Sequence, residues 1–127
     1  MSNTDRVLSL MKKKNKPLTA YEILDDLSSE GINAPTTIYR ALNKLVSKGL
    51  IHKIESLNSW MVCCGVHKNK IPIFEICKYC GDVKEHLDKK LTESIKTLTN
   101  RTGFLPDNPI FEIHGQCEQC SFNITNN

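Results

Sequence analysis

Two Cys-x-x-Cys pairs hold four of the chain's six cysteines: Cys77 with Cys80, and Cys117 with Cys120. Thiolates three residues apart can bind one side of a zinc ion from a tight turn, and a distant second pair can close the other side. A glycine directly follows the first pair, and another lies two residues before the second. Glycine permits the positive φ that lets backbone amides turn toward sulfur. The sequence therefore predicts a structural zinc site made of four thiolates.

Disulfides or a redox dithiol would also use paired cysteines. The N-terminal residues lack the basic and then apolar pattern of a secretory signal, and no apolar stretch approaches the ~20 residues that cross a bilayer. We therefore expect a cytoplasmic protein, with no membrane partner and with reduced thiols. Structural zinc contributes on the order of 10–16 kcal/mol in small peptides, against ~5–15 kcal/mol of net stability for a typical domain. The chain is expected to fold around its metal.

Charge and cysteine content divide the 127-residue chain into two parts. Residues 1–60 contain nine Lys/Arg, six Asp/Glu and no cysteine, whereas the remainder contains eight of each charge and all six cysteines. We expect two domains, over residues 1–64 and 65–127. The basic excess of the first part is only a weak indication of nucleic-acid binding, because solvated lysines are common on any surface.

Apolar residues at helical spacing predict three helices in the first domain. The first covers residues 4–11 and is followed by lysines that suit a helix C-terminus. Thr19 and Glu22 are spaced as a capping box that opens the second helix. Pro35 suits the first turn of the third helix, which runs to Lys48. The apolar positions of this third helix fall on one face: Ile38, Ala41, Leu42 and Leu45.

The opposite face of the third helix carries short hydrogen-bonding groups, one aromatic ring and two cations, the types that read base edges and bind phosphates. They are Thr36, Thr37, Tyr39, Arg40, Asn43, Lys44 and Ser47. Two alternating runs over residues 50–55 and 59–63 predict a hairpin. Three helices and then a hairpin is the order of a winged helix-turn-helix, whose third helix enters the major groove. We expect this face, with Tyr21 of the second helix, to contact double-stranded DNA, although it would look the same if it were only solvated.

The second domain reads as a small α/β unit. Strands are predicted over residues 72–77, 82–86 and 109–114, with a helix over residues 88–101 whose Leu91, Ile95 and Leu98 point inward. So small a sheet with one helix buries little by itself, and we therefore expect a homodimer. The predicted fold class is α+β: an N-terminal winged helix-turn-helix followed by a small α/β dimerisation domain with a structural zinc site.

Together these segments resemble the ferric uptake regulator family of bacterial metal-sensing repressors. Residues 36–42 are similar to its recognition helix, residues 50–55 to its wing, and the paired cysteines to its structural zinc site. The resemblance covers about residues 5–120, and residues 58–63, 83–85 and 113–117 are similar to its zinc uptake regulator branch. It implies operator binding by a homodimer and repression of zinc-import genes when zinc is plentiful. The family has a further helix before the first one predicted here, for which this sequence has almost no room, so a lowered operator affinity is expected.

The resemblance also implies a regulatory zinc site at the hinge between the domains, giving one structural and one regulatory zinc per subunit. The matching ligands are His52, Cys63, Glu85 and, in a loop of different length, His67. His86 and His114 are the alternatives for the fourth position. One thiolate, two imidazoles and one carboxylate form a plausible tetrahedral zinc set. Taken alone, His52 also suits a partly buried histidine and Cys63 a small core residue, and no role is assigned to Cys64.

Three other functions are compatible with parts of the sequence. An iron- or peroxide-responsive regulator is disfavoured by Cys63, because a soft thiolate favours zinc and is easily oxidised. A Cys-x-x-Cys thiol oxidoreductase would need a βαβ context that is lacking here. A zinc carrier that does not bind DNA is the third. We expect a zinc-responsive repressor that is not an enzyme.

Overall fold

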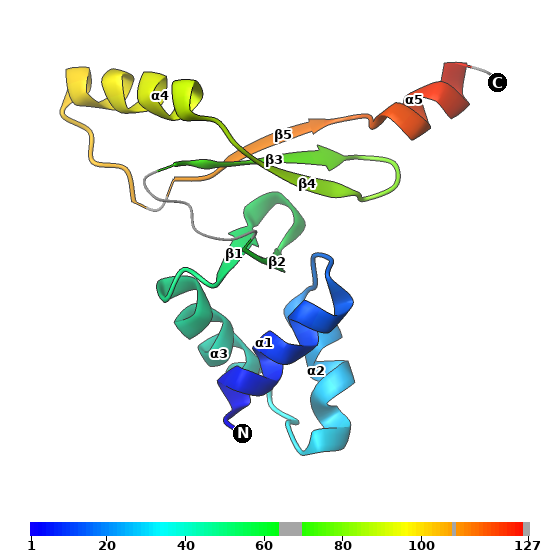
Figure 1. Ribbon diagram of the computed structural model, residues 1–127. Helices are drawn as coiled ribbons and strands as arrows, with labels where there is room; N and C mark the ends of the chain where they lie inside the picture. Colours follow the sequence, from blue (N-terminus) through cyan, green and yellow to red (C-terminus); the bar gives the residue numbers. More distant parts are fainter. Residues whose placement is uncertain (64–69, 108, 126–127) are drawn as a thin grey trace. The chain divides into compact units, whose positions relative to one another are not determined.

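The computed structural model of the protein describes residues 1–63, 70–107 and 109–125 (Figure 1). The chain divides into two compact units, Met1–Gly65 and Val66–Asn127. Within the described ranges, no helix has the length and hydropathy of a membrane span.

The first unit is a winged helix-turn-helix, as predicted. Three helices are followed by a two-stranded antiparallel hairpin (Figure 1). Their bounds are α1 (Asn3–Lys14), α2 (Ala20–Leu27), α3 (Pro35–Ser47), β1 (Ile51–Ile54) and β2 (Ser59–Val62). A 3-10 turn over Ser28–Glu30 follows α2, and another over Glu55–Leu57 joins the two strands.

Local hydrogen bonds explain where the first two helices begin. The Thr19 hydroxyl accepts from the Glu22 amide at 3.2 Å, and the Glu22 carboxylate accepts from the Thr19 amide at 3.0 Å. The predicted capping box is thus confirmed. Ser2 and Asp5 form a second capping box that was not predicted, and α1 consequently starts at Asn3. This helix also extends three residues beyond its predicted end, because its lysines remain helical up to Lys14.

One apolar face of α3 forms the centre of the core of the first unit. The four predicted inward residues are all buried, and they pack in one cluster with Val7 and Met11 of α1 and Ile23 of α2. Full burial of such side chains contributes roughly 1.5–3 kcal/mol each relative to exposure. This core leaves the polar face of α3 at the surface.

The hairpin is joined to this core through Trp60. Its amide and carbonyl both pair with Leu18, at 2.8 and 2.9 Å, in a short bridge to the segment between α1 and α2. The strand register sets Lys53 opposite Trp60 and His52 opposite Met61. Because successive strand residues face opposite sides, His52 lies on the other face of the hairpin from Trp60.

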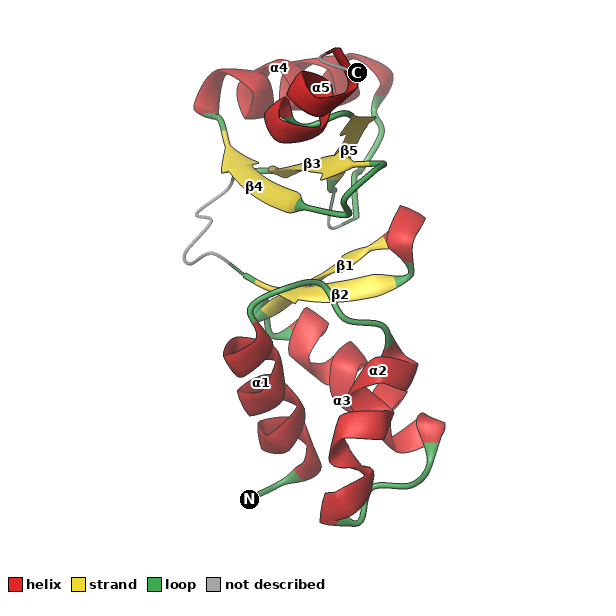
Figure 2. Cartoon of the chain, turned by 90° about the vertical axis from the view of Figure 1, so that its right-hand side faces the viewer, coloured by secondary structure: helices red, strands yellow, loops and turns green. Residues whose placement is uncertain are grey.

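The second unit is built on a three-stranded sheet with the order β4-β3-β5. The central strand β3 (Pro72–Cys77) runs antiparallel to β4 (Val83–Leu87) and parallel to β5 (Phe111–Gly115). Helix α4 (Lys89–Thr102) makes the crossover between β4 and β5, and α5 (Glu118–Thr125) follows β5. Both helices lie on the same side of the sheet (Figure 2). The three strands and α4 were predicted, whereas α5 was not.

The prediction of an inward apolar stripe on α4 is wrong for two of its three residues. Leu91 is 41% exposed and Leu98 58% exposed, while Ile95 is half-buried. A sheet of three short strands is too small to cover the whole apolar side of a 14-residue helix. The second unit therefore carries an apolar surface that its own chain does not bury.

Candidate metal centre and nucleic-acid interface

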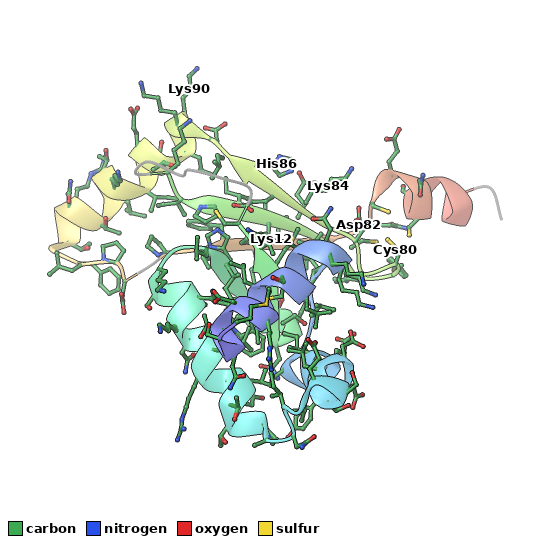
Figure 3. All side chains as sticks on the ribbon, turned by 60° about the horizontal axis from the view of Figure 1, so that its bottom comes forward. Lys12, Cys80, Asp82, Lys84, His86 and Lys90 are labelled. Atoms are coloured by element: carbon green, nitrogen blue, oxygen red, sulfur yellow. The ribbon has the colours of Figure 1, made fainter. Side chains whose placement is uncertain are left out.

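The paired cysteines come together because β3 and β5 are parallel neighbours. Strand β3 ends at Cys77, and a tight turn closes with the Gly81 amide donating to the Cys77 carbonyl at 3.0 Å. Gly81 has φ of 76°, a conformation that favours glycine. Strand register sets Gly115 beside Cys77, so the second pair begins next to the first. Figure 3 shows Cys80 and Asp82 at this turn.

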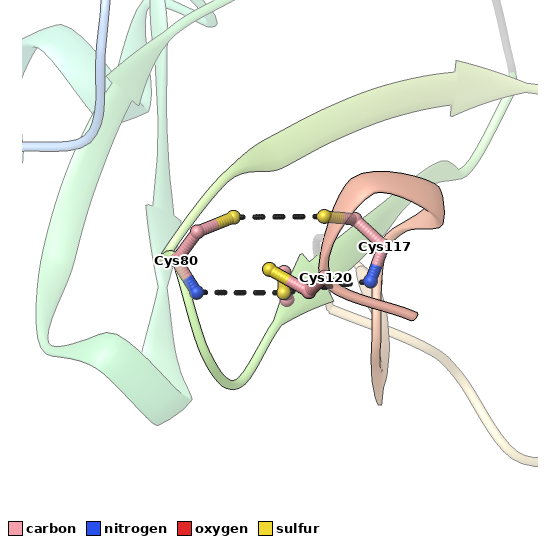
Figure 4. Close-up of side chains that lie close together, drawn as sticks. Cys80, Cys117 and Cys120 are labelled. Atoms are coloured by element: carbon pink, nitrogen blue, oxygen red, sulfur yellow. Dashed lines mark hydrogen bonds between the residues drawn. The ribbon is translucent and has the colours of Figure 1, made fainter. Parts of the chain in front are cut away.

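The four sulfur atoms have the spacing of a single metal site. They lie within 4.8 Å of one another, and the Cys80 and Cys117 Sγ atoms are 3.7 Å apart (Figure 4). Zn–S bonds of about 2.3 Å in a tetrahedron place neighbouring sulfurs about 3.8 Å apart. The cluster thus fits zinc in both donor type and size.

Backbone amides make the thiol of Cys77 more acidic than an ordinary cysteine thiol. Its Sγ accepts from the amides of Cys80 at 3.5 Å, Cys117 at 3.4 Å and Tyr79 at 3.4 Å. Hydrogen bonds from these amides lower the pKa of Cys77 to about 6, because they stabilise the thiolate. A shared hydrogen bond with Cys117 raises the pKa of Cys120 to about 12. Negative charge is therefore favoured on Cys77, and binding of a dication would release protons from Cys80 and Cys120, whose pKa values are raised.

One part of this cluster had no counterpart in the sequence-based prediction: α5, whose first turn carries Cys120. The amide hydrogen bonds to Cys77 agree with the expectation that backbone amides turn toward sulfur, although the sequence did not indicate which cysteine accepts them. The glycines beside the pairs were the available signal for the turn, but the short segment after Cys117 has little helical periodicity to reveal α5.

The residues expected to form the regulatory site are distributed over both units. His52 lies in β1, and Cys63 directly follows β2, where its amide donates to the Leu50 carbonyl at 3.0 Å. Cys63 pairs with Leu50, and His52 pairs with Met61. Because Leu50 and His52 are two residues apart along one arm of the hairpin, the side chains of His52 and Cys63 lie on the same face of the hairpin. Glu85 lies in β4 of the second unit, opposite Phe74. The grouping of Glu85 with the hairpin residues stays a prediction.

The remaining histidines have the following positions. His86, on β4, pairs with the Glu75 carboxylate of β3, and Figure 3 shows it on the same strand as Lys84. His114 lies in β5 opposite Ile76. His67 and Cys64 lie outside the described residues.

The proposed DNA-contacting residues differ in exposure. Thr36, Arg40, Asn43 and Lys44 of α3 are exposed, as is Tyr21 near the start of α2. Thr37 and Tyr39 are half-buried. The exposed set leaves hydrogen-bonding and cationic groups on one side of α3, as a groove-reading helix requires. DNA contact by each residue stays a prediction.

A winged helix-turn-helix joined to a small α/β unit with a four-thiol cluster defines the class of metal-binding transcription regulators. Residues 3–114 match the Ferric uptake regulator family. The chain belongs to this family, whose members are transcription regulators rather than enzymes.

Similar proteins include regulators named for zinc and for iron. The chain is 36% identical to the zinc uptake regulation protein of Escherichia coli K12 over 119 residues, covering 90% of this chain and 68% of that protein. It is 27% identical to the ferric uptake regulation protein of Legionella pneumophila over 120 residues, covering 91% and 85% respectively.

Two solved structures share the whole fold. A zinc uptake regulator complexed with zinc and DNA has a TM-score of 0.86 at 32% identity, over 98% of this chain and 85% of that one. The holo form of XcZur has a TM-score of 0.83 at 32% identity, over 96% and 86%.

Proposed function

We propose that this protein is a zinc-responsive transcriptional repressor that binds operator DNA as a homodimer when zinc occupies a regulatory site. The observation that carries the proposal is the likeness, over nearly the whole chain, to a zinc uptake regulator complexed with zinc and DNA. The exposed polar face of α3 and the four-thiol cluster supply the chemistry that such a protein needs. Operator binding would place the protein in the cytoplasm.

The four-thiol cluster is proposed to hold the structural zinc. Cys77 ends β3 and Cys80 lies in the turn that follows, whereas Cys117 lies between β5 and α5 and Cys120 lies in the first turn of α5. Zinc bound by all four would cross-link two cysteine pairs that have 36 residues between them in the sequence. Such a link would stabilise a unit whose apolar core is small.

A second zinc per subunit is proposed to be the regulatory one. Its ligands would be His52, Cys63 and Glu85, with His67 as the fourth. The common hairpin face of His52 and Cys63 supports the first two, and a thiolate in the set favours zinc over iron. His114 is the better reserve ligand, since His86 already pairs with Glu75.

The exposed apolar surface of the second unit supports the homodimer. Leu98 on α4 is 58% exposed, and Ile113 on β5 is 55% exposed. Strand β5 is also one of the two outer strands of the described sheet. An outer strand with apolar neighbours is a surface that another chain can cover. We propose that a second copy does so.

The test begins with a duplex selected from a random-sequence pool by the protein with zinc, referred to below as the enriched duplex. Its binding is then measured by gel shift with zinc, with Fe²⁺ and with a chelator, and the mass of the complex by light scattering. We expect a zinc-dependent shift by a dimer and weak, zinc-independent binding to an unselected duplex of equal length. A shift with Fe²⁺ but not zinc would instead support the iron-responsive alternative.

A further inference from the structure

The chain's single tryptophan, Trp60, connects the wing to the rest of the winged helix. It is 2% exposed, and its main chain is fixed by the two hydrogen bonds to Leu18. A side chain held in this way cannot move without disturbing both the hairpin and the segment before α2. The indole therefore has a fixed position within the first unit, against which other side chains can pack.

The recognition helix α3 contacts this surface through Tyr39. The two rings meet edge to face, with centroids 5.9 Å apart and an interplanar angle of 72°, a geometry that aromatic pairs prefer. Tyr39 is half-buried, whereas Arg40, the next residue, is exposed. The ring of Tyr39 is thus held at the margin between the core and the polar face of α3.

The wing contacts the same indole from the neighbouring strand. Lys53 lies opposite Trp60 in the hairpin register, and its Nζ is 5.2 Å from the ring centroid, within the range of a cation–π interaction. The same ammonium also forms a salt bridge of 3.3 Å with Glu55. One indole consequently touches a residue of α3 and a residue of the wing.

We infer that Trp60 is a positioning residue for DNA recognition, acting through Tyr39. The inference rests on the proposed function, since it requires that α3 binds DNA. With the indole in place, the Tyr39 ring is already ordered before DNA arrives. Without it, the ring must be immobilised during binding, at a cost that reduces affinity about 3- to 10-fold for one such side chain. Non-specific binding, which depends on phosphate charge, does not need the ring in one position.

The test is a double-mutant cycle on Trp60→Leu and Tyr39→Leu. Affinities are measured with zinc by fluorescence anisotropy on the enriched duplex and on an unselected duplex of equal length. We expect Trp60→Leu to weaken binding to the enriched duplex about 3- to 10-fold and to leave the unselected duplex nearly unchanged. The double variant should bind no more weakly than Tyr39→Leu alone, because Trp60 acts through that ring. Additive losses, or an unchanged preference for the enriched duplex in Trp60→Leu, would overturn the inference.

Two further variants separate positioning from stability. Trp60→Phe keeps an aromatic ring facing Tyr39 and should recover most of the preference for the enriched duplex. If Trp60→Leu does not fold, Trp60→Met, which also lacks the ring, replaces it in the cycle. Val7→Ala removes buried volume from α1, which should lower the melting temperature without changing the ratio of the two affinities. If the ratio of the affinities for the enriched and unselected duplexes followed the melting temperature across all variants, Trp60 would contribute only through core packing, and the inference would be wrong. Failure of the proposed function would appear differently, as a wild-type protein without zinc-dependent binding.

Discussion

At the scale of single residues, one side chain in each unit, with opposite chemistry, characterises that unit. Cys77 receives three amide hydrogen bonds and thereby becomes the anionic centre of the four-thiol cluster. Arg40, on the exposed face of α3, presents a planar cation suited to bidentate contact with guanine. Changes at these positions should affect different properties of the protein.

Cys77→Ser should remove the structural zinc and unfold the second unit. A hydroxyl is a much poorer zinc ligand than a thiolate, and the binding energy of structural zinc is also folding energy. Bound zinc is measured by elemental analysis, and folding by circular dichroism on heating. A variant with an unchanged melting temperature and unchanged dimer would contradict the structural role. Cys63→Ser, outside the cluster, is the matched control.

Arg40→Ala and Lys44→Ala should weaken DNA binding in different ways. Losing a bidentate arginine contact to guanine costs about 1–3 kcal/mol and should act mainly on the enriched duplex. Losing a lysine contact to phosphate should weaken both duplexes alike and reduce the slope of log K against log salt by about 0.9. Binding at several salt concentrations distinguishes them. If Arg40→Ala lost the same affinity for both duplexes, Arg40 would contact a phosphate rather than a base.

At the scale of elements, helix starts are fixed by local hydrogen bonds, whereas helix faces are fixed by what packs against them. The capping box of α2 is complete within four residues. It lowers the pKa of Glu22 through hydrogen bonds to the carboxylate from the Thr19 backbone and side chain. This link between a cap and an ionisable group makes the helix start sensitive to acid.

Thr19→Ala should destabilise the first unit by about 1 kcal/mol, the usual effect of losing an N-cap hydroxyl. Glu22→Gln should be destabilising at neutral pH, with an effect that disappears in acid. Because the folded pKa of Glu22 lies below its ordinary 4.5, the carboxylate stabilises the folded state above that ordinary value. This contribution is lost as the pH falls through the folded pKa.

Urea denaturation of wild type and Glu22→Gln from pH 3 to pH 7 measures this effect. The two midpoints should converge at the acid end. If the difference between the two urea midpoints stayed constant from pH 3 to pH 7, the charge of Glu22 would make no contribution to the cap. Glu30→Gln, which changes an exposed carboxylate outside the box, is the control for net charge.

At the scale of the whole molecule, the proposed function requires that zinc changes the balance between DNA-binding and non-binding states. A ligand shifts such a balance only by its differential affinity for the two states. A change from about 1% to 99% competent requires about 10⁴-fold tighter binding to the competent state, or ~5.5 kcal/mol. If His52, Cys63 and Glu85 share one zinc, as proposed above, a state that lacks one of these ligands would bind zinc more weakly, which can supply this difference.

Cys63→Ser should therefore stay folded and dimeric, keep the structural zinc and lose zinc-dependent binding to the enriched duplex. Size-exclusion chromatography with light scattering, elemental analysis and gel shifts measure these properties together. His52→Ala should behave in the same way. The regulatory-site proposal fails if both variants bind with wild-type zinc dependence. If His67→Ala alone kept wild-type zinc-dependent binding, the fourth ligand would be another histidine.

The sequence determined those features whose signals are short and local. Thr19 and Glu22 specify a helix start, the spacing of Ile38 and Leu42 specifies the inward face of α3, and Cys-x-x-Cys specifies a turn that can present two thiols to a metal. Each pattern depends on residues a few positions apart, so neighbouring backbone geometry decides it. The Ser2–Asp5 box was present in the same form but was less recognisable, because aspartate replaces the usual Glu or Gln at its third helical position.

Only the tertiary structure decided which distant segments meet. The parallel pairing of β3 with β5 brings Cys117 beside Cys77, and the packing of the hairpin in the core of the first unit brings Trp60 to Tyr39. The tertiary structure also leaves Leu91 and Leu98 of α4 exposed, although their spacing matches that of a buried apolar stripe. Periodicity identifies the apolar side of a helix, but the area of the surface that packs against it determines how much of that side is buried, and that area depends on the rest of the chain and on any partner.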